Sequence, residues 1–283
     1  MADRYTYIPY IGLFYIVGSG LDNWKNHSFK KASVILIVTG VLLSILSFNQ
    51  ASIWKNSSTL WDHAIKVHPS FRAYNNRGLV FHKEGNNERA LQYYDEALKL
   101  NNNDAEVYTN RGNVLSEKRN FDAALSDYNS ALSVKTDYIA ALDNRGALYG
   151  AMGKFELAIG DLSKAIKLDP TYKSAYANRG TAFLDYGKYD QAIKDFNKYL
   201  DFGPGDVDIM NSIGVCFQYL KKYDESLKVF NRMISINPKP VFFLNRSFTW
   251  KGLGNLEEAR KDALIARQGG VKVPEAYALF LGM

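Results

Sequence analysis

The sequence has little cysteine, little proline and only a small excess of positive charge. One cysteine in 283 residues, Cys216, excludes an internal disulfide framework and a cysteine-rich zinc site. Seven prolines and 21 glycines are too few for a collagen-like or linker-like chain. The formal charge of +6 is mild, and because basic and acidic residues are interspersed it predicts no nucleic-acid partner. The chain does have 47% apolar residues, which is too many for a disordered chain.

Two uncharged apolar runs lie within the first 54 residues. The stronger run, 32–50, approaches the roughly 20 residues that cross a bilayer, and Trp54 follows it as an interfacial residue. The weaker run, 5–21, is interpreted as a second span or a re-entrant piece. A signal peptide fits less well, because no small-residue cleavage motif follows the stronger run. The sequence therefore predicts one or two membrane helices.

The loop between the two runs indicates the orientation of these helices. It contains three lysines and one aspartate (Lys25, Lys30, Lys31 and Asp22). Positively charged loops stay in the cytoplasm. Everything after residue 54 is therefore expected outside the cytoplasm, in the periplasm or a lumen.

The remainder of the chain is a repeat of 34 residues. Its glycines recur at that interval: Gly78, Gly112, Gly146, Gly180 and Gly214. Four of them follow Asn-Arg; repeat five has Ser-Ile, and Asn245-Arg246-Ser247 restores the pattern after one deleted residue. Twelve positions later comes a small residue (Ala90, Ala124, Ala158, Ala192, Ser226 and Ala259). Four positions further on comes a bulky one (Tyr94, Tyr128, Leu162, Phe196 and Phe230), except at Ala263.

These motifs resemble the tetratricopeptide repeat, in which pairs of helices stack because one pair cannot bury its own apolar face. The resemblance implies an all-α fold, a right-handed α-solenoid of about six helix pairs preceded by one or two transmembrane helices. The six units are 71–104, 105–138, 139–172, 173–206, 207–239 and 240–273. Residues 1–54 form the membrane segment, 55–70 a connecting helix and 274–283 a C-terminal capping helix. Gly85, Gly153, Gly187 and Gly254 are expected to end first helices in the left-handed conformation.

An arginine and an aspartate sixteen residues apart appear and vanish together. Repeat five lacks both and has Ile213 and Val229, whereas repeat one has Arg77 with Tyr93 at the aspartate position. We interpret the remaining four as structural ion pairs between helices: Arg111–Asp127, Arg145–Asp161, Arg179–Asp195 and Arg246–Asp262.

One asparagine per repeat falls on the expected first helix, except at Ser212: Asn76, Asn110, Asn144, Asn178 and Asn245. In the resembling family the first helices line a concave groove. In the repeat domain of the nucleocytoplasmic sugar transferases, such a ladder grips the backbone of an extended peptide. An amide can donate to a carbonyl and accept from an N–H without requiring a sequence. The partner implied is a protein or extended peptide; alternatively, asparagine is simply common in this subtype of repeat.

No catalytic residue, cofactor or metal site is predicted. The four histidines (His27, His63, His68 and His82) have no metal-ligand spacing. The pair Asp206 and Asp208 is similar to the acidic pair of metal-dependent sugar transferases, but it lies where a helix-capping aspartate is expected. Cys216 is expected to be packed rather than nucleophilic.

Residues 2–14 resemble a segment near the last membrane helices of multi-span glycosyltransferases, O-mannosyltransferase-like proteins that end in tetratricopeptide repeats. The catalytic positions of that family lie far upstream, and none is present in this chain. Two hypotheses follow: a membrane-anchored extracytoplasmic scaffold that binds protein or peptide, or the C-terminal acceptor-binding portion of a membrane glycosyltransferase. A soluble cytoplasmic adaptor is a third, which requires both apolar runs to pack in a globule. The sequence carries no indication of the oligomeric state.

Overall fold

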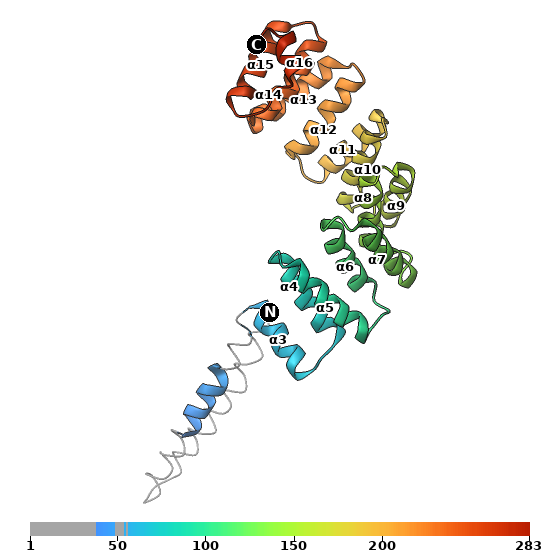
Figure 1. Ribbon diagram of the computed structural model, residues 1–283, viewed down its shortest axis with the longest axis vertical. Coiled ribbons are helices and arrows are strands. Elements are labelled where there is room, and N and C mark those ends of the chain that lie inside the picture. Colours follow the sequence, from blue (N-terminus) through green and yellow to red (C-terminus); the bar gives the residue numbers. More distant parts are fainter. Residues whose placement is uncertain (1–37, 49–53, 55) are drawn as a thin grey trace, which may run out of the picture.

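The computed structural model describes residues 38–48, 54 and 56–283, and the regular structure within these ranges is helical (Figure 1). Between α3 (Ser57–Val67) and α16 (Glu275–Phe280) lie six helix pairs. They are α4 (Phe71–Lys83) with α5 (Asn87–Leu100), α6 (Ala105–Glu117) with α7 (Phe121–Val134), α8 (Ile139–Ala151) with α9 (Phe155–Leu168), α10 (Lys173–Asp185) with α11 (Tyr189–Asp201), α12 (Val207–Tyr219) with α13 (Tyr223–Ile236), and α14 (Pro240–Gly252) with α15 (Leu256–Gln268). The predicted all-helical solenoid is confirmed.

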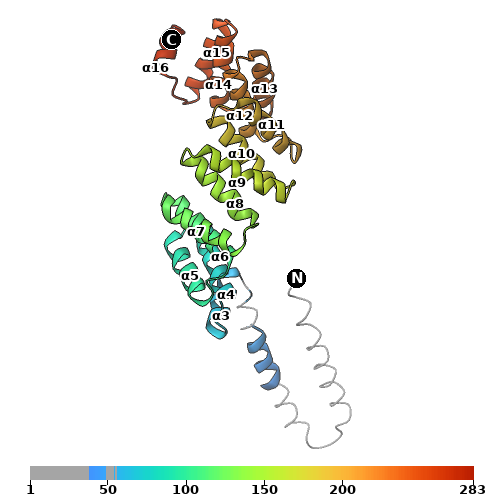
Figure 2. The same ribbon diagram turned by 90° about the vertical axis from the view of Figure 1, so that its right-hand side faces the viewer.

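The pairs stack in chain order into a long curved array (Figures 1 and 2). The first helix of each pair packs against the first helix of the next pair, which makes one continuous layer. The second helix of each pair also packs against the next first helix. Figure 1 shows α6 and α8 on the inside of the curve, with α7 and α9 on the outside. The array therefore has an inner layer of first helices and an outer layer of second helices.

A glycine on the first helix interlocks with a bulky residue on the second. A Cβ atom on Gly146 would lie 2.6 Å from Cγ of Leu162, so no larger residue fits without movement. The same contact occurs in four other pairs: Gly78–Tyr94, Gly112–Tyr128, Gly180–Phe196 and Gly214–Phe230. In the sixth pair both residues change, to Ser247 on α14 and Ala263 on α15, and both are fully buried. Ser247 Oγ donates to the backbone oxygen of Leu244 and accepts a hydrogen bond from the Tyr277 hydroxyl of α16.

The turns inside the helix pairs need a left-handed residue. Four of the six turns use a glycine with φ between 73° and 78°, as predicted: Gly85, Gly153, Gly187 and Gly254. The other two place Arg119 and Lys221 in the same conformation, with φ of 60° and 58°. A side chain makes this conformation costly, so these two turns carry strain that the other four avoid.

Short helices close both ends of the array. Helix α3 packs against α4 as the lone second helix of an incomplete unit, and Asn56 caps it by accepting a hydrogen bond from the Thr59 amide. At the other end, α16 places Tyr277 and Leu281 against Leu244 and the buried alanines of α15. Helix α16 thus packs on the last helix pair, where the C-terminal capping helix was predicted.

The predicted membrane segment lies mostly outside the described residues. Of the run 32–50, residues 38–48 are described, and they are helical. Six of their large apolar side chains are exposed, from 51% at Ile45 to 76% at Phe48, and Leu43 is partly buried. Within the described ranges, no helix combines the length and the apolar character needed to cross a membrane. The run 5–21 lies outside the described residues.

Candidate functional site

The first helices of the six pairs present a common inner face. We define the inner face as the side chains at the second, fifth, sixth, ninth, twelfth and thirteenth residues of α4, α6, α8, α10, α12 and α14. Side-chain hydrogen bonds between these positions join neighbouring first helices; one runs from Asn75 on α4 to Glu106 on α6. Another runs from Ser174 on α10 to Asp143 on α8. Local caps hold the helices in register, as where the Asp104 carboxylate accepts two amide hydrogen bonds at the start of α6.

The predicted asparagine ladder lies on this inner face, at the sixth position of each helix. Four of the asparagines donate an N–H to a polar side chain of the preceding repeat. The donor–acceptor pairs are Asn110 to Asn75 at 3.0 Å, Asn144 to Asn113 at 2.8 Å, Asn178 to Asp143 at 2.9 Å, and Asn245 to Asn211 at 2.6 Å. These bonds fix which way each amide points. Within the described part of the chain, the side-chain oxygen of each of these asparagines has no hydrogen-bond partner. The second N–H also has none in Asn110, Asn144 and Asn245, whereas in Asn178 it makes a long contact of 3.5 Å with Ser174 Oγ.

Asn76 and Ser212 depart from this pattern. The side chain of Asn76, in the first repeat, takes part in none of the hydrogen bonds among the described residues. Ser212, in repeat five, donates to the backbone oxygen of Asp208 within its own helix. The ordered part of the ladder therefore consists of Asn110, Asn144 and Asn178 in consecutive repeats, followed by Asn245 after one gap.

The acceptors of the ladder were not recognised from the sequence. Asn75, Asp143 and Asn211 occupy the fifth helix position in repeats one, three and five, one residue before the ladder position. Asp143 is 3% exposed, and burial raises the pKa of its carboxyl group, while hydrogen bonds from Ser174 and Asn178 oppose that shift. The recurrence of asparagine or aspartate there in alternate repeats was the available signal.

The structure brings all four arginine–aspartate pairs together, away from the inner face. Arg145 makes a two-pronged contact, with Nε 2.6 Å and Nη2 2.8 Å from the two oxygens of Asp161. Arg111–Asp127, Arg179–Asp195 and Arg246–Asp262 have the same geometry. The third nitrogen of each arginine reaches the second helix of the preceding repeat, at Asp95, Asn129, Ser163 or Asn231. Each arginine thus ties two adjacent repeats.

In the first repeat the arginine donates its hydrogen bonds to the preceding helix, α3, and none to its own second helix. Arg77 donates from Nε and Nη2 to the carboxylate of Asp62 on α3, at 2.7 and 3.1 Å. The position sixteen residues after Arg77 holds Tyr93, and the actual partner lies before Arg77 in the sequence, so this ion pair was not predicted. In repeat five, Ile213 is 4% exposed and packs in an apolar cluster that includes Val229. An apolar pair therefore occupies the site of the ion pair there.

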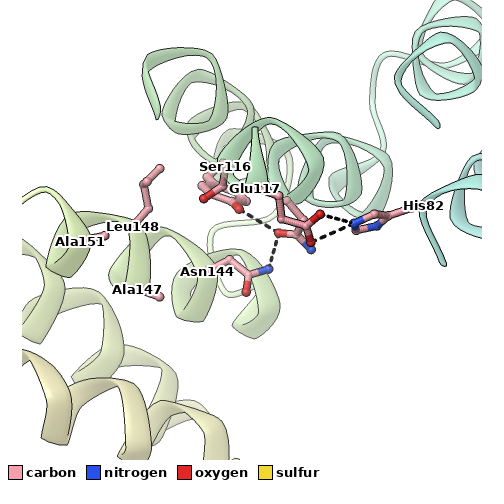
Figure 3. Close-up of a pocket in the computed structure, with 9 residues that line it drawn as sticks. His82, Ser116, Glu117, Asn144, Ala147, Leu148 and Ala151 are labelled. Atoms are coloured by element: carbon pink, nitrogen blue, oxygen red, sulfur yellow. Dashed lines mark hydrogen bonds and ion pairs between the residues drawn. The ribbon is translucent and has the colours of Figure 1, made fainter. Parts of the chain in front are cut away.

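A hollow of about 380 Å³ opens on the inner face between repeats one and three. Figure 3 shows the His82–Glu117 pair on one side and Ala147, Leu148 and Ala151 of α8 on the other. His82 Nε2 lies 2.9 Å from both carboxylate oxygens of Glu117. Asn113 also lines the hollow, and its side-chain oxygen accepts hydrogen bonds from Tyr128 and Asn144, each at 2.8 Å. Both N–H groups of Asn113 are therefore turned away from these two partners.

The residues considered for catalysis or metal binding have structural roles. Asp206 caps α12 by accepting hydrogen bonds from the amides of Asp208 and Ile209, as predicted. Cys216 is fully buried, and burial raises the pKa of its thiol to about 12, so the unreactive protonated form prevails. The described residues contain no group of three histidine, cysteine or acidic side chains arranged to hold a metal ion.

Models of the tetratricopeptide repeat family match five stretches of this chain. A model described as "TPR repeat" matches 78–119, and models described as "Tetratricopeptide repeat" match 105–138, 141–172, 162–194 and 207–240. These matches all lie within the array of helix pairs described above.

Two curated proteins are similar over part of the repeat array. The chain is 27% identical over 110 residues to the protein O-mannosyl-transferase Tmtc2 of Drosophila melanogaster, covering 38% of this chain and 12% of that protein. It is 33% identical over 100 residues to the human protein O-mannosyl-transferase TMTC3, covering 34% and 11%. The matched part thus spans about an eighth or less of these relatives.

Solved structures share the fold. The type IV pilus biogenesis factor PilW superposes with a TM-score of 0.67 at 18% identity, covering 74% of this chain and 98% of PilW. YrrB, described as a TPR protein with an unusual peptide-binding site, superposes with a TM-score of 0.54 at 24% identity, covering 64% and 94%. At these identities the likeness is one of fold.

Proposed function

The chain belongs to the tetratricopeptide repeat family, and from that premise we propose that it is a membrane-anchored scaffold that binds an extended peptide along its inner face. The asparagine ladder is the observation that carries this proposal. Each ladder amide donates one N–H to the preceding repeat, which leaves its oxygen without a partner in three consecutive repeats. A second N–H is also without a partner in Asn110 and Asn144, and in Asn178 it makes only a long contact of 3.5 Å with Ser174. These are the groups that a peptide backbone pairs with.

The spacing of the ladder fits an extended chain. Packed helices lie roughly 8–10 Å apart, and an extended peptide advances about 3.3 Å per residue. One ladder asparagine would therefore meet every third residue of the peptide. Backbone contacts of this kind recognise extended conformation rather than sequence.

The test is peptide binding by the full-length chain in a nonionic detergent. The triple change Asn110→Ala, Asn144→Ala and Asn178→Ala removes three ladder amides. At about 1 kcal/mol for each lost hydrogen-bonding site, affinity for a pool of fluorescent random peptides should fall roughly a hundredfold. A matched control changes Asn102, Asn103 and Asn197, which are exposed and off the inner face, to alanine. Equal loss in both triple variants, or no loss in the first, contradicts the proposal.

Membrane anchoring through the N-terminal helices is part of the same proposal, with the repeats outside the cytoplasm. It is supported by the uncharged run 32–50, by the exposed apolar side chains of residues 38–48, and by the lysines between the two apolar runs. Protease added to intact spheroplasts should digest the repeats. Protection in spheroplasts, with digestion only after lysis, would place the repeats in the cytoplasm and overturn this part of the proposal.

A second candidate function rests on the two curated relatives, which are named as O-mannosyl-transferases. We propose, as the alternative, that the chain is the C-terminal acceptor-binding portion of a membrane glycosyltransferase. The groove would then hold the acceptor protein while catalytic residues elsewhere transfer the sugar. Genomic sequence in frame with the start of this chain discriminates the two: many further hydrophobic spans favour the enzyme, and their absence favours the scaffold.

A further inference from the structure

Charge on the inner face is distributed in a way that the overall composition hides. On α6, α8, α10 and α12 the inner face contains no lysine or arginine, although the whole chain carries +6. The same four helices contribute five acidic residues to it: Glu106, Glu117, Asp143, Asp185 and Asp208. Basic inner-face residues occur only at the two ends, on α4 and α14: Arg72, Lys83 and Lys251. The middle of the inner face, on α6, α8, α10 and α12, is therefore acidic.

These five carboxylates lack strong cationic partners. Within the described part of the chain, none of them forms an ion pair with lysine or arginine. Glu106 accepts from Asn75, and Glu117 contacts the imidazole of His82. By contrast, each of the four aspartates between the two helix layers forms an ion pair with an arginine. The inner face is thus left complementary to a positively charged ligand.

The hollow on the inner face has room for one long side chain of that charge. Ala147, Leu148 and Ala151 line one side with apolar carbon, and Glu117 stands opposite (Figure 3). Lysine and arginine combine an apolar stem with a charged head, and they bury the stem along apolar surface while the head meets a carboxylate. Glu117 is 55% exposed, and its contact with one nitrogen of His82 leaves lone pairs for a second donor. Its neighbour Asn144 belongs to the ladder, so backbone and side-chain contacts are contiguous.

We propose that the groove selects extended peptides carrying lysine or arginine, and that the hollow of Glu117, Ala147 and Ala151 receives this basic side chain. The inference rests on the proposed peptide-binding function and adds the chemical class of its ligand. The ladder holds the peptide backbone, and the hollow sets which side chain is preferred at one position.

The experiment uses fluorescent nonapeptide pools with uncharged random flanks and a central residue fixed as Lys, Arg, Gln, Glu, Leu or Ala. Binding to the full-length chain in nonionic detergent is followed by fluorescence polarisation. The Lys and Arg pools should bind about fivefold more tightly than the Gln pool, the effect of one partly exposed ion pair. The Glu pool should bind more weakly than the Gln pool, and raising the salt concentration should shrink these differences.

Two variants locate the preference. Glu117→Gln should bring the Lys and Arg pools to the level of the Gln pool. Glu96→Gln on α5 is the matched control, since Glu96 is similarly exposed at 49% but lies on an outer helix, and it should change nothing. Ala147→Leu fills the hollow and should weaken the Lys and Arg pools while leaving the Ala pool unchanged. Because Glu117 and Ala147 are exposed, both variants should fold, which circular dichroism verifies.

The outcomes separate this inference from the function on which it rests. If no pool binds, the peptide-binding function fails and the inference fails with it. If all pools bind alike, or the Leu pool binds best, the groove binds peptides but the basic preference is wrong. If the Lys and Arg preference persists in Glu117→Gln, the preference does not arise from this hollow.

Discussion

Breaking one arginine–aspartate tie should cost much more stability than replacing both of its members. Arg145 and Asp161 are the sharpest case, because their side chains are only 21% and 14% exposed and are joined by two short hydrogen bonds. The hydrogen bond to Asp161 is also the largest reason why the pKa of Arg145 is raised. Arginine stays charged without a partner, so removing Asp161 leaves a cation and not a neutral group. Asp161→Ala leaves the guanidinium partly buried without its carboxylate.

The magnitude follows from the burial of the pair. Removing one partner of a buried ion pair costs roughly 3–5 kcal/mol, and the residual exposure of Arg145 favours the lower end, about 3 kcal/mol. In an array of this size that lowers the melting temperature by roughly 6–12 °C. The double change Arg145→Ile with Asp161→Val copies the apolar pair Ile213 and Val229 of repeat five. It should lie within about 1 kcal/mol of the wild type, because a buried pair can be replaced by apolar residues at little cost.

Urea unfolding of the full-length chain in detergent, followed by circular dichroism, measures both variants. Asp161→Ala should unfold at a clearly lower urea concentration than the double variant. Equal midpoints, or a double variant that is the less stable of the two, would refute the reasoning. Only the double variant also loses the hydrogen bond from Arg145 to Asn129. That loss can only reduce the expected difference in stability between the two variants.

Three further sets of changes test other parts of the fold. Arg119→Gly should stabilise the chain by up to about 1 kcal/mol, because the turn requires a positive φ; Gly85→Ala at the equivalent turn should destabilise it. Gly146→Ala should lower the free energy of unfolding by about 1–3 kcal/mol through the clash with Leu162. Gly146→Ser combined with Leu162→Ala copies repeat six, and it should lower the free energy of unfolding by less than the sum of the two single changes. Asp143→Asn should raise stability at pH 7, because equivalent positions carry asparagine. Burial raises the pKa of the Asp143 carboxyl, so the native state binds more protons than the unfolded state. Stability of the wild-type chain should therefore fall as the pH rises through that pKa. Melting temperatures measured from pH 4 to 7 should show this dependence in the wild type and not in Asp143→Asn.

The repeat and its packing could be predicted because each contact recurs in the sequence at a fixed interval. The 34-residue spacing of glycines located the close approaches, and the joint loss of arginine and aspartate in repeat five indicated the ties. The tie between Arg77 and Asp62 was missed because Asp62 lies on α3, outside the six units. Only a contact repeated in other units can be found in this way.

The candidate site was predicted less completely. The ladder asparagines could be named, but the orientation of their amides depends on acceptors in neighbouring repeats, such as Asn75 for Asn110. The acidic character of the inner face depends on knowing which helix positions face inward, so the whole sequence looked evenly mixed. The hollow arises only where His82, Glu117 and Ala147 from three helices meet.

The central claim is that the asparagine ladder holds a peptide backbone. The direct measurement is a thermodynamic cycle between a bound peptide, the same peptide with its backbone amides N-methylated at every third residue, the wild-type chain and the triple ladder variant. N-methylation removes the N–H that would donate to a ladder oxygen. It should weaken binding to the wild-type chain at least about tenfold and have little effect on the variant. An equal loss for both proteins would contradict the claim.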